Sequence, residues 1–180
     1  MTIVPSSRHS GTRENRFSVT PVGTPAEGWI GRFEESRFTL SKSVESVIRS
    51  TRFTVTEGVT TEVVILKATL FSERDRMTRK VYAEGLRRGL TTLSIEAACL
   101  IRVTLSDRDL AKMGFWWLAA MHEPIEDYAH DLTLLTLDRD VGGRLLRDGS
   151  GDPNARWPRD GGFAFARQAT PESSKPISNR

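Results

Sequence analysis

The segment TTEVVILKATLF, residues 60–71, constrains the fold more than any other part of this chain. β-Branched residues dominate it, which is typical of a strand. Val63 to Leu66 is apolar without a break, whereas a strand with one face in water alternates apolar and polar residues. The run therefore predicts a strand that is covered on both faces, with packing partners on each side of its sheet.

The other periodic segments place helices early in the chain and strands late. A short helix with apolar residues at 44, 47 and 48 is expected after a cap at Ser41 or Ser43, and the alternating run 38–40 has the pattern of a short strand. The segment LSIEAACLIRV predicts a second helix, with a strand as the alternative. Strands are expected in FWWLAAMH, LTLLTLDRD and GGFAFARQ, and a capped single turn in SDRDLAKMG. The pattern indicates an α+β fold, with two or three helices packed on an antiparallel or mixed sheet.

The 180 residues are enough for one domain with tails. Residues 1–28 and 169–180 are rich in small and polar residues and lack apolar periodicity, so we expect disordered termini around a domain at 29–168. No apolar run approaches a membrane span, and the first residues have no secretory signal pattern. The single cysteine, Cys99, indicates a reducing compartment and reads as a small buried hydrophobe. We therefore expect a cytoplasmic protein.

Two resemblances accompany this pattern. The order of elements over residues 37–168 resembles an uncharacterised family of small bacterial proteins with a Trp-rich C-terminal segment, which implies no activity and no site residue. The ending, with RLLRDGS and GGFAFAR, is similar to C-type-lectin-like domains related to formylglycine-generating enzymes. Asp148 stands where those domains have glycine, and their paired reactive cysteines are absent here. This resemblance therefore implies a ligand-binding variant, such as a variable binding protein, without the oxidase chemistry.

The stretch MHEPIEDYAHD, residues 121–131, has the densest set of groups that bind metals or move protons. The H-E-x-x-H zinc motif is absent, because Pro124 follows Glu123 and the next histidine comes eight residues after the first. We predict no metal site and no cofactor, and we interpret the stretch as the polar edge of a buried strand. The alternative is a hydrolase that uses acid–base chemistry at His122, Glu123, His130 and Asp131.

The net charge of +3 is spread unevenly along the chain. Residues 1–52 carry eight Lys/Arg against five Asp/Glu, whereas residues 121–153 carry three arginines against eight acids. A helix is expected to start at Ser72, with Asp75 completing the cap and Gly89 ending it. Its apolar stripe would be Met77, Val81, Leu86 and Leu90. Its outer side would carry Arg76, Arg79, Lys80, Arg87 and Arg88, as a solvated face or, alternatively, as a contact for nucleic acid.

The segment DGSGDPNARWPRDGG, residues 148–162, is expected to be a long loop. Trp157 at its centre is either a plug of the core or an anchor for a partner, and we favour the anchor because Arg156 and Arg159 flank it. Strand alternation at Trp116 and Trp117 would bury one ring and turn the other outward. The leading prediction is a non-enzymatic domain that binds a small ligand or a protein. The predicted ligand-binding residues are Trp157, Arg156, Arg159, Asn154 and Asp160.

Overall fold

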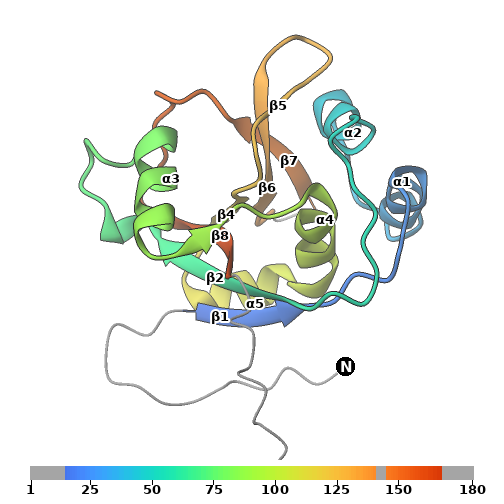
Figure 1. The fold of residues 1–180 in the computed structure, drawn as a ribbon, viewed down its shortest axis with the longest axis horizontal. Helices are drawn as coiled ribbons and strands as arrows, with labels where there is room; N and C mark the ends of the chain where they lie inside the picture. The colour runs from blue at the N-terminus through green and yellow to red at the C-terminus, as the bar shows by residue number, and fades with distance from the viewer. Residues whose placement is uncertain (1–14, 141–144, 168–180) are drawn as a thin grey trace, which may run out of the picture.

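The computed structural model describes residues 15–140 and 145–167 (Figure 1). The described part contains five α-helices and eight strands, so the predicted α+β class is confirmed with more helices than expected. The helices are α1 (Ala26–Glu35), α2 (Lys42–Ile48), α3 (Thr78–Arg87), α4 (Ile95–Thr104) and α5 (Asp107–Met113), with a 3-10 turn η1 (Ala68–Leu70). The strands are β1 (Asn15–Val19), β2 (Thr61–Lys67), β3 (Leu90–Thr91), β4 (Trp117–Ala120), β5 (Ile125–Glu126), β6 (Leu132–Asp138), β7 (Leu145–Ser150) and β8 (Gly161–Arg167).

All eight strands belong to one mixed sheet. The main order is β1-β2-β8-β4-β6-β5, while β3 pairs with β8 and β7 pairs with β6. Only β4 and β8 run parallel among the strand pairs, and the others are antiparallel. Residues 136–138 of β6 pair with both β4 and β7, so β7 lies on the opposite edge of β6 from β4. In this order, strand β8 lies between β2 and β4, in the interior of the sheet.

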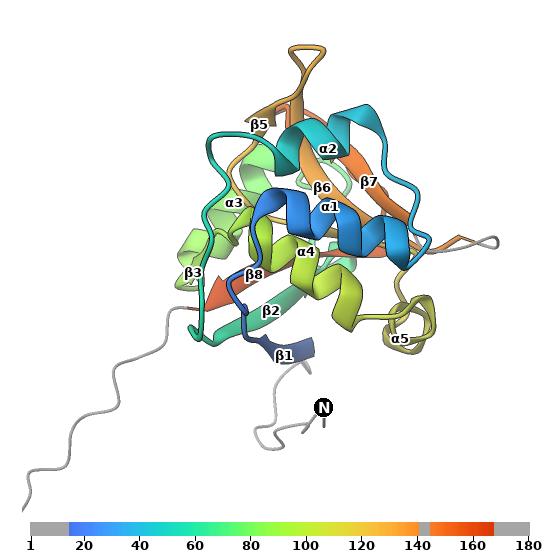
Figure 2. The same ribbon diagram turned by 90° about the vertical axis from the view of Figure 1, so that its right-hand side faces the viewer.

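The two faces of the sheet carry separate cores, as β2 illustrates. Val63 and Ile65 pack into a large cluster with residues from α1, α2 and α4, and Figure 2 shows these helices together on one side. Val64 and Leu66 pack on the opposite face, in a smaller cluster with α3 and η1. Neighbouring residues of a strand point to opposite faces, so a sheet with two cores needs a continuously apolar strand. The prediction that this strand is covered on both faces is confirmed.

Residues 15–28 belong to the fold, although their composition predicted a disordered tail. Strand β1 pairs along its length with β2, and α1 starts at Ala26. The strand is short and lies at the sheet edge, where alternate residues such as Arg16 and Ser18 remain polar, so its apolar pattern is weak. Its stability comes from a ladder with residues that are distant in sequence. The other predicted tail residues, 1–14 and 169–180, lie outside the described part of the chain.

Helix α3 starts later than predicted. Asp75 does accept a hydrogen bond from the Ser72 hydroxyl at 2.6 Å, but this bond closes a turn before the helix, which begins at Thr78. The predicted apolar stripe is also wrong beyond Val81, because Leu86 is 75% exposed and Leu90 belongs to β3. Gly89 follows the helix with a φ of 70°, as a helix terminator should.

The other predicted elements are largely confirmed. Ser41 caps α2 through its hydroxyl, which accepts a hydrogen bond from the Val44 amide at 3.2 Å, and LSIEAACLIRV forms α4 with Cys99 fully buried. The run 38–40 forms no strand and makes only an isolated bridge between Thr39 and Leu145. None of the described helices is both long and apolar enough to cross a lipid bilayer.

Helix α5 has a complete capping box. The Ser106 hydroxyl accepts a hydrogen bond from the Asp109 amide at 3.2 Å, and the Asp109 carboxylate accepts one from the Ser106 amide at 3.1 Å. We expect Ser106→Ala to lower the free energy of unfolding by about 1 kcal/mol, because it leaves helix N–H groups without an acceptor. Urea unfolding measures the change. Ser106→Thr keeps the hydroxyl and serves as control, and equal losses in both variants would contradict the assignment.

Candidate binding surface

His122 is a structural residue inside the fold. Its side chain is buried, its Nδ1 donates to the Glu123 carbonyl at 2.7 Å, and its Nε2 accepts from the Leu135 amide at 3.0 Å. Burial lowers the pKa of His122 to about 4, and the hydrogen bond to Glu123 opposes this only in part. A neutral imidazole with both nitrogens occupied fixes β4 against β6. It has no free nitrogen with which to bind a metal or activate water.

The other polar residues of MHEPIEDYAHD do not converge on His122. Glu123 forms an ion pair with Arg52 at 3.3 Å, and exposed His130 bonds to the carboxylate of Glu126. Asp131 is exposed on the same hairpin. Within residues 15–140 and 145–167, no three His, Cys, Asp or Glu side chains come together in a metal-binding group. His122 lies at the polar end of a buried strand, and the acids are dispersed along the turn that follows.

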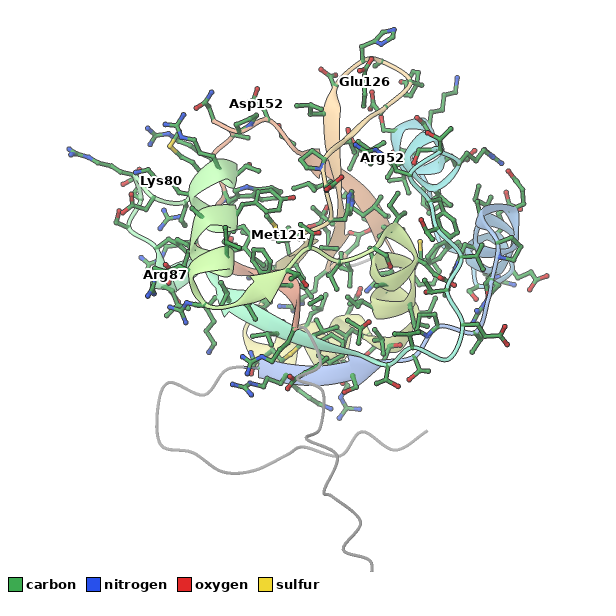
Figure 3. The ribbon with its side chains drawn as sticks, viewed as in Figure 1. Arg52, Lys80, Arg87, Met121, Glu126 and Asp152 are labelled. Atoms are coloured by element: carbon green, nitrogen blue, oxygen red, sulfur yellow. The ribbon has the colours of Figure 1, made fainter. Side chains whose placement is uncertain are left out.

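The cations of α3 and of the residues that flank it have partners within the fold. Arg76 donates to the carbonyls of Trp157 and Phe71, Arg79 donates to Asn154, and Lys80 bonds to Asp75. Figure 3 shows Lys80 and Arg87 on the outer side of this helix. Arg87 and Arg88 both bind Glu84, each at 2.7 Å, and these bonds lower the pKa of that carboxyl to about 2. Such pairs reduce the charge that a polyanion would meet.

The predicted loop is shorter than expected and is fixed to α3. Asp148–Ser150 belong to β7 and Gly161 starts β8, which leaves residues 151–160. The first helical amides of α3 donate to the loop: Thr78 N–H to the Ala155 carbonyl at 3.1 Å and Arg79 N–H to the Pro153 carbonyl at 3.0 Å. Helix α3 has no side-chain cap, so these carbonyls take that role. The loop is therefore an ordered part of the fold.

Trp157 packs as a plug, contrary to the anchor that we favoured. Its ring stacks on Trp117 with centroids 5.2 Å apart and meets the ring of Phe163 edge-on at 5.7 Å. Its Nε1 donates to the Thr78 hydroxyl at 3.0 Å. A Cβ on Gly149 would lie 2.9 Å from the ring, so the strand beneath it has no room for a side chain. The flanking arginines did not indicate an exposed ring, because their own side chains point to solvent while the indole enters the smaller core.

Two further predicted ligand-binding residues hold the loop in place. Asn154 accepts the bond from Arg79, and the Asp160 carboxylate accepts a hydrogen bond from Trp117 Nε1 at 3.0 Å. Arg156 and Arg159 are exposed. Asn154 and Asp160 are exposed as well, so Trp157 is the one of the five predicted residues that is partly buried.

The fourth tryptophan, Trp116, lies on the surface beside this loop. Its amide donates to the Asp160 carbonyl at 2.8 Å, and its carbonyl accepts from the Arg139 amide at 2.9 Å. Trp116 is 54% exposed and Trp117 is buried, which confirms that one of the two adjacent tryptophans faces outward. The Arg139 guanidinium lies 4.2 Å from the ring centroid. Sequence reasoning missed Arg139, because the strand register that pairs it with Trp116 is not visible locally.

The chain matches no family model, no curated protein and no solved structure. Both resemblances drawn from its sequence therefore remain predictions, and the surface has to be interpreted from its own chemistry. We name the Trp116 surface as the set Trp116, Arg139, Pro158 and Arg159, since Arg139 covers the ring and the exposed residues 158–159 precede Asp160, whose carbonyl accepts from the Trp116 amide.

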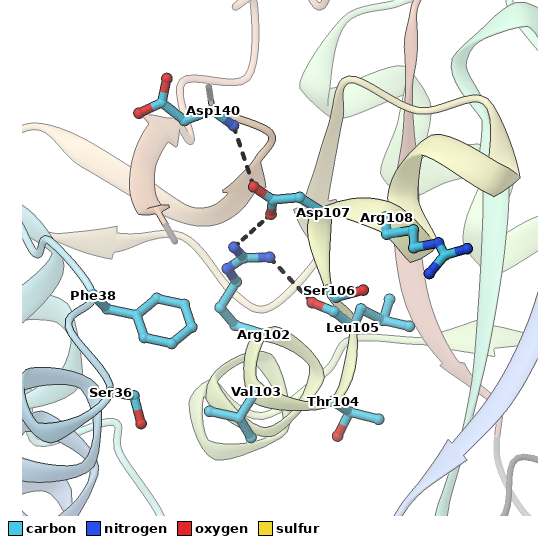
Figure 4. A pocket seen from close by; sticks show the side chains of 10 residues that line it. All are labelled: Ser36, Phe38, Arg102, Val103, Thr104, Leu105, Ser106, Asp107, Arg108 and Asp140. Atoms are coloured by element: carbon cyan, nitrogen blue, oxygen red, sulfur yellow. Dashed lines mark hydrogen bonds and ion pairs between the residues drawn. The ribbon is translucent and has the colours of Figure 1, made fainter. Parts of the chain in front are cut away.

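A cavity of about 400 Å³ lies where α4 meets α5, and Figure 4 shows the residues that line it. Two arginines line it: Arg108 is exposed, whereas Arg102 is buried and donates to Asp107 at 2.7 Å and to the Leu105 carbonyl at 3.1 Å. The Phe38 ring lies 5.1 Å from the guanidinium carbon. Arg102 is thus neutralised and enclosed by the fold, which makes the cavity a poorer candidate for ligand binding than the Trp116 surface.

Proposed function

We propose that this chain is a non-enzymatic protein-binding domain whose contact surface is the Trp116 surface. One observation carries the proposal: Trp116 is the one tryptophan of the four that keeps a largely exposed ring, and it is held rigidly. Exposed tryptophan beside arginine is the composition of binding hot spots. The surface is not enclosed as small-molecule sites usually are, which favours a protein partner.

Rigidity supports the same function. The backbone of Trp116 is bonded on both sides, to Asp160 and to Arg139, and the guanidinium covers one face of the ring. A side chain that is already ordered loses little conformational entropy when a partner covers it. The role also agrees with the non-enzymatic binding that the C-terminal resemblance implies. Neither the hydrolase nor the nucleic-acid alternative gains a comparable observation, because His122 and the α3 cations are engaged within the fold.

The test compares Trp116→Ala with wild type as immobilised baits in an extract of cells that make the protein. We expect at least one captured protein to bind the variant about 30-fold or more weakly, which corresponds to a hot spot of about 2 kcal/mol. The melting temperature should stay within about 2 °C, because the ring contributes little to the core. Leu86→Ala removes another exposed apolar side chain, from α3, and serves as the control. Identical sets of captured proteins for all three baits would contradict the proposal.

A further inference from the structure

The hairpin formed by β5 and the first residues of β6, residues 125–133, stands away from the body of the protein. Figures 1 and 2 show it extending past the helices in two perpendicular views. Ile125 pairs with Thr133 and Glu126 pairs with Leu132, and the turn between them makes the tip. The base of the hairpin is in the core, because Ile125 belongs to the larger cluster and Thr133 is buried, whereas Tyr128 and residues 129–132 are exposed and available for contact with another molecule.

Asp127 braces the turn at the tip through hydrogen bonds. This carboxylate is buried, and one of its oxygens accepts from the Ala129 amide at 2.8 Å and from the Asp131 amide at 3.1 Å. Hydrogen bonds from the Ser43 hydroxyl and from these turn amides lower the pKa of Asp127, so it stays ionised. The bond from Ser43 also ties the hairpin to α2. The tip is therefore rigid, and partners would meet it without a large ordering cost.

The rigid hairpin displays apolar side chains to solvent. Tyr128, at the turn, is 62% exposed, and Leu132, on the following arm, is 43% exposed. Exposed aromatic and aliphatic groups on an ordered projection are typical of contact surfaces, because their burial against a partner is favourable. Tyrosine suits this role, since it offers a large ring at a low entropic cost and a hydroxyl that can remain hydrogen-bonded.

The charge around the tip selects the partner. Residues 121–133 contain four acids and no lysine or arginine. Glu123 is paired with Arg52, Asp127 is used inside the turn and Glu126 bonds to His130. Residues 125–133 still carry three carboxylates, of Glu126, Asp127 and Asp131, against one histidine, so the hairpin has a negative field. A surface of the same sign would be repelled, whereas a positive surface would be attracted.

We infer that this hairpin is a second interaction surface, which places Tyr128 in an apolar slot of a basic protein partner. The site is separate from the Trp116 surface. Seven-residue β6 runs from Leu132, on the hairpin, to Asp138, which precedes Arg139. At about 3.3 Å per residue, the two surfaces lie roughly 20 Å apart. The inference does not rest on the proposed function, and the chain would join two partners if both are correct.

The probe is a phage-displayed library of random 16-residue peptides, selected on wild-type protein. Each selected peptide is then measured by titration against Tyr128→Ala, Asp131→Lys and Trp116→Ala. We expect a class of peptides, enriched in lysine and arginine, that binds Tyr128→Ala about 30-fold or more weakly and binds Trp116→Ala as well as wild type. Asp131→Lys and added salt should both weaken this class, because the attraction is electrostatic and exposed.

Tyr128→Phe is the matched control, since it keeps the ring and should retain most of the affinity. The inference is overturned if no peptide depends on Tyr128, or if the Tyr128-dependent peptides are neutral or acidic. It is also overturned if every such peptide depends equally on Trp116, which would indicate one continuous surface. In the first two outcomes the proposed function at Trp116 would stand unaffected, so the two failures can be told apart.

Discussion

Trp157→Ala is expected to lower the free energy of unfolding by about 3 kcal/mol, at the lower end of the range for deletion of a packed aromatic ring. The ring is partly buried, and its loss would leave Trp117 and Phe163 without their stacking partner. It would also leave the Thr78 hydroxyl without the Nε1 donor. Thermal unfolding measures the change, and a loss of this size shifts the midpoint by about 6–12 °C in a domain of this length.

The same substitution should loosen α3. The carbonyls that cap this helix belong to the loop that Trp157 fixes, and Arg76 donates to the Trp157 carbonyl at 3.1 Å. We therefore expect faster hydrogen exchange at the first amides of α3, with little change in α4. Arg156→Ala, at an exposed neighbouring position, is the control and should cost less than about 0.5 kcal/mol. A variant that melts within about 1 °C of wild type would mean that the ring is dispensable to the fold.

Acidification is expected to destabilise the protein through His122. Its pKa is about 4 in the folded state because of burial, whereas an unperturbed histidine has a pKa of 6.5. Between these values the unfolded chain binds a proton that the folded chain does not, so stability falls as the pH falls. The contribution is fully present above pH 6.5 and is lost towards pH 4. At about 1.4 kcal/mol per pKa unit, the loss is about 2 kcal/mol by pH 5 and about 3 kcal/mol by pH 4.

Between pH 6.5 and 5 the expected loss comes from His122, because burial raises the pKa of the Asp138 carboxyl, which therefore acts in the opposite direction as the pH falls. Carboxyls whose folded pKa is lowered, such as Glu84 and Asp109, lose their contribution only at lower pH. His130 has a raised pKa because of its bond to Glu126, so its contribution is present below pH 6.5 and is lost only as the pH rises. Urea unfolding at several pH values, with His122→Gln as the variant that cannot titrate, measures the effect. Parallel stability curves for the two proteins would exclude His122 as the cause.

Local signals predicted the elements that depend on local physics. The caps at Ser41 and at the start of α5, the αL glycine at Gly89 and the continuous apolar run of β2 each act within a few residues, so they can be recognised in the sequence. Ser72 has the same local pattern but closes a turn instead of capping α3. The sequence did not reveal β1, because its pairing with β2 joins segments more than forty residues apart. The roles of Trp157 and Trp116 depend on distant partners in the same way. Trp157 contacts Thr78 and Trp117, and the β4–β6 register places Arg139 over the ring of Trp116.

The interior position of β8 has a consequence for the order in which the chain can assemble. Strands β2 and β4 both come earlier in the sequence, yet neither contacts the other in the sheet without β8 between them. Until β8 inserts, each has an edge with unpaired backbone groups, and these edges can pair with other chains. A ribosome releases β2, α3 and β4 well before β8, so the nascent protein passes through a stage with two open edges. Long-range closure of this kind slows folding and exposes the open edges to aggregation during synthesis.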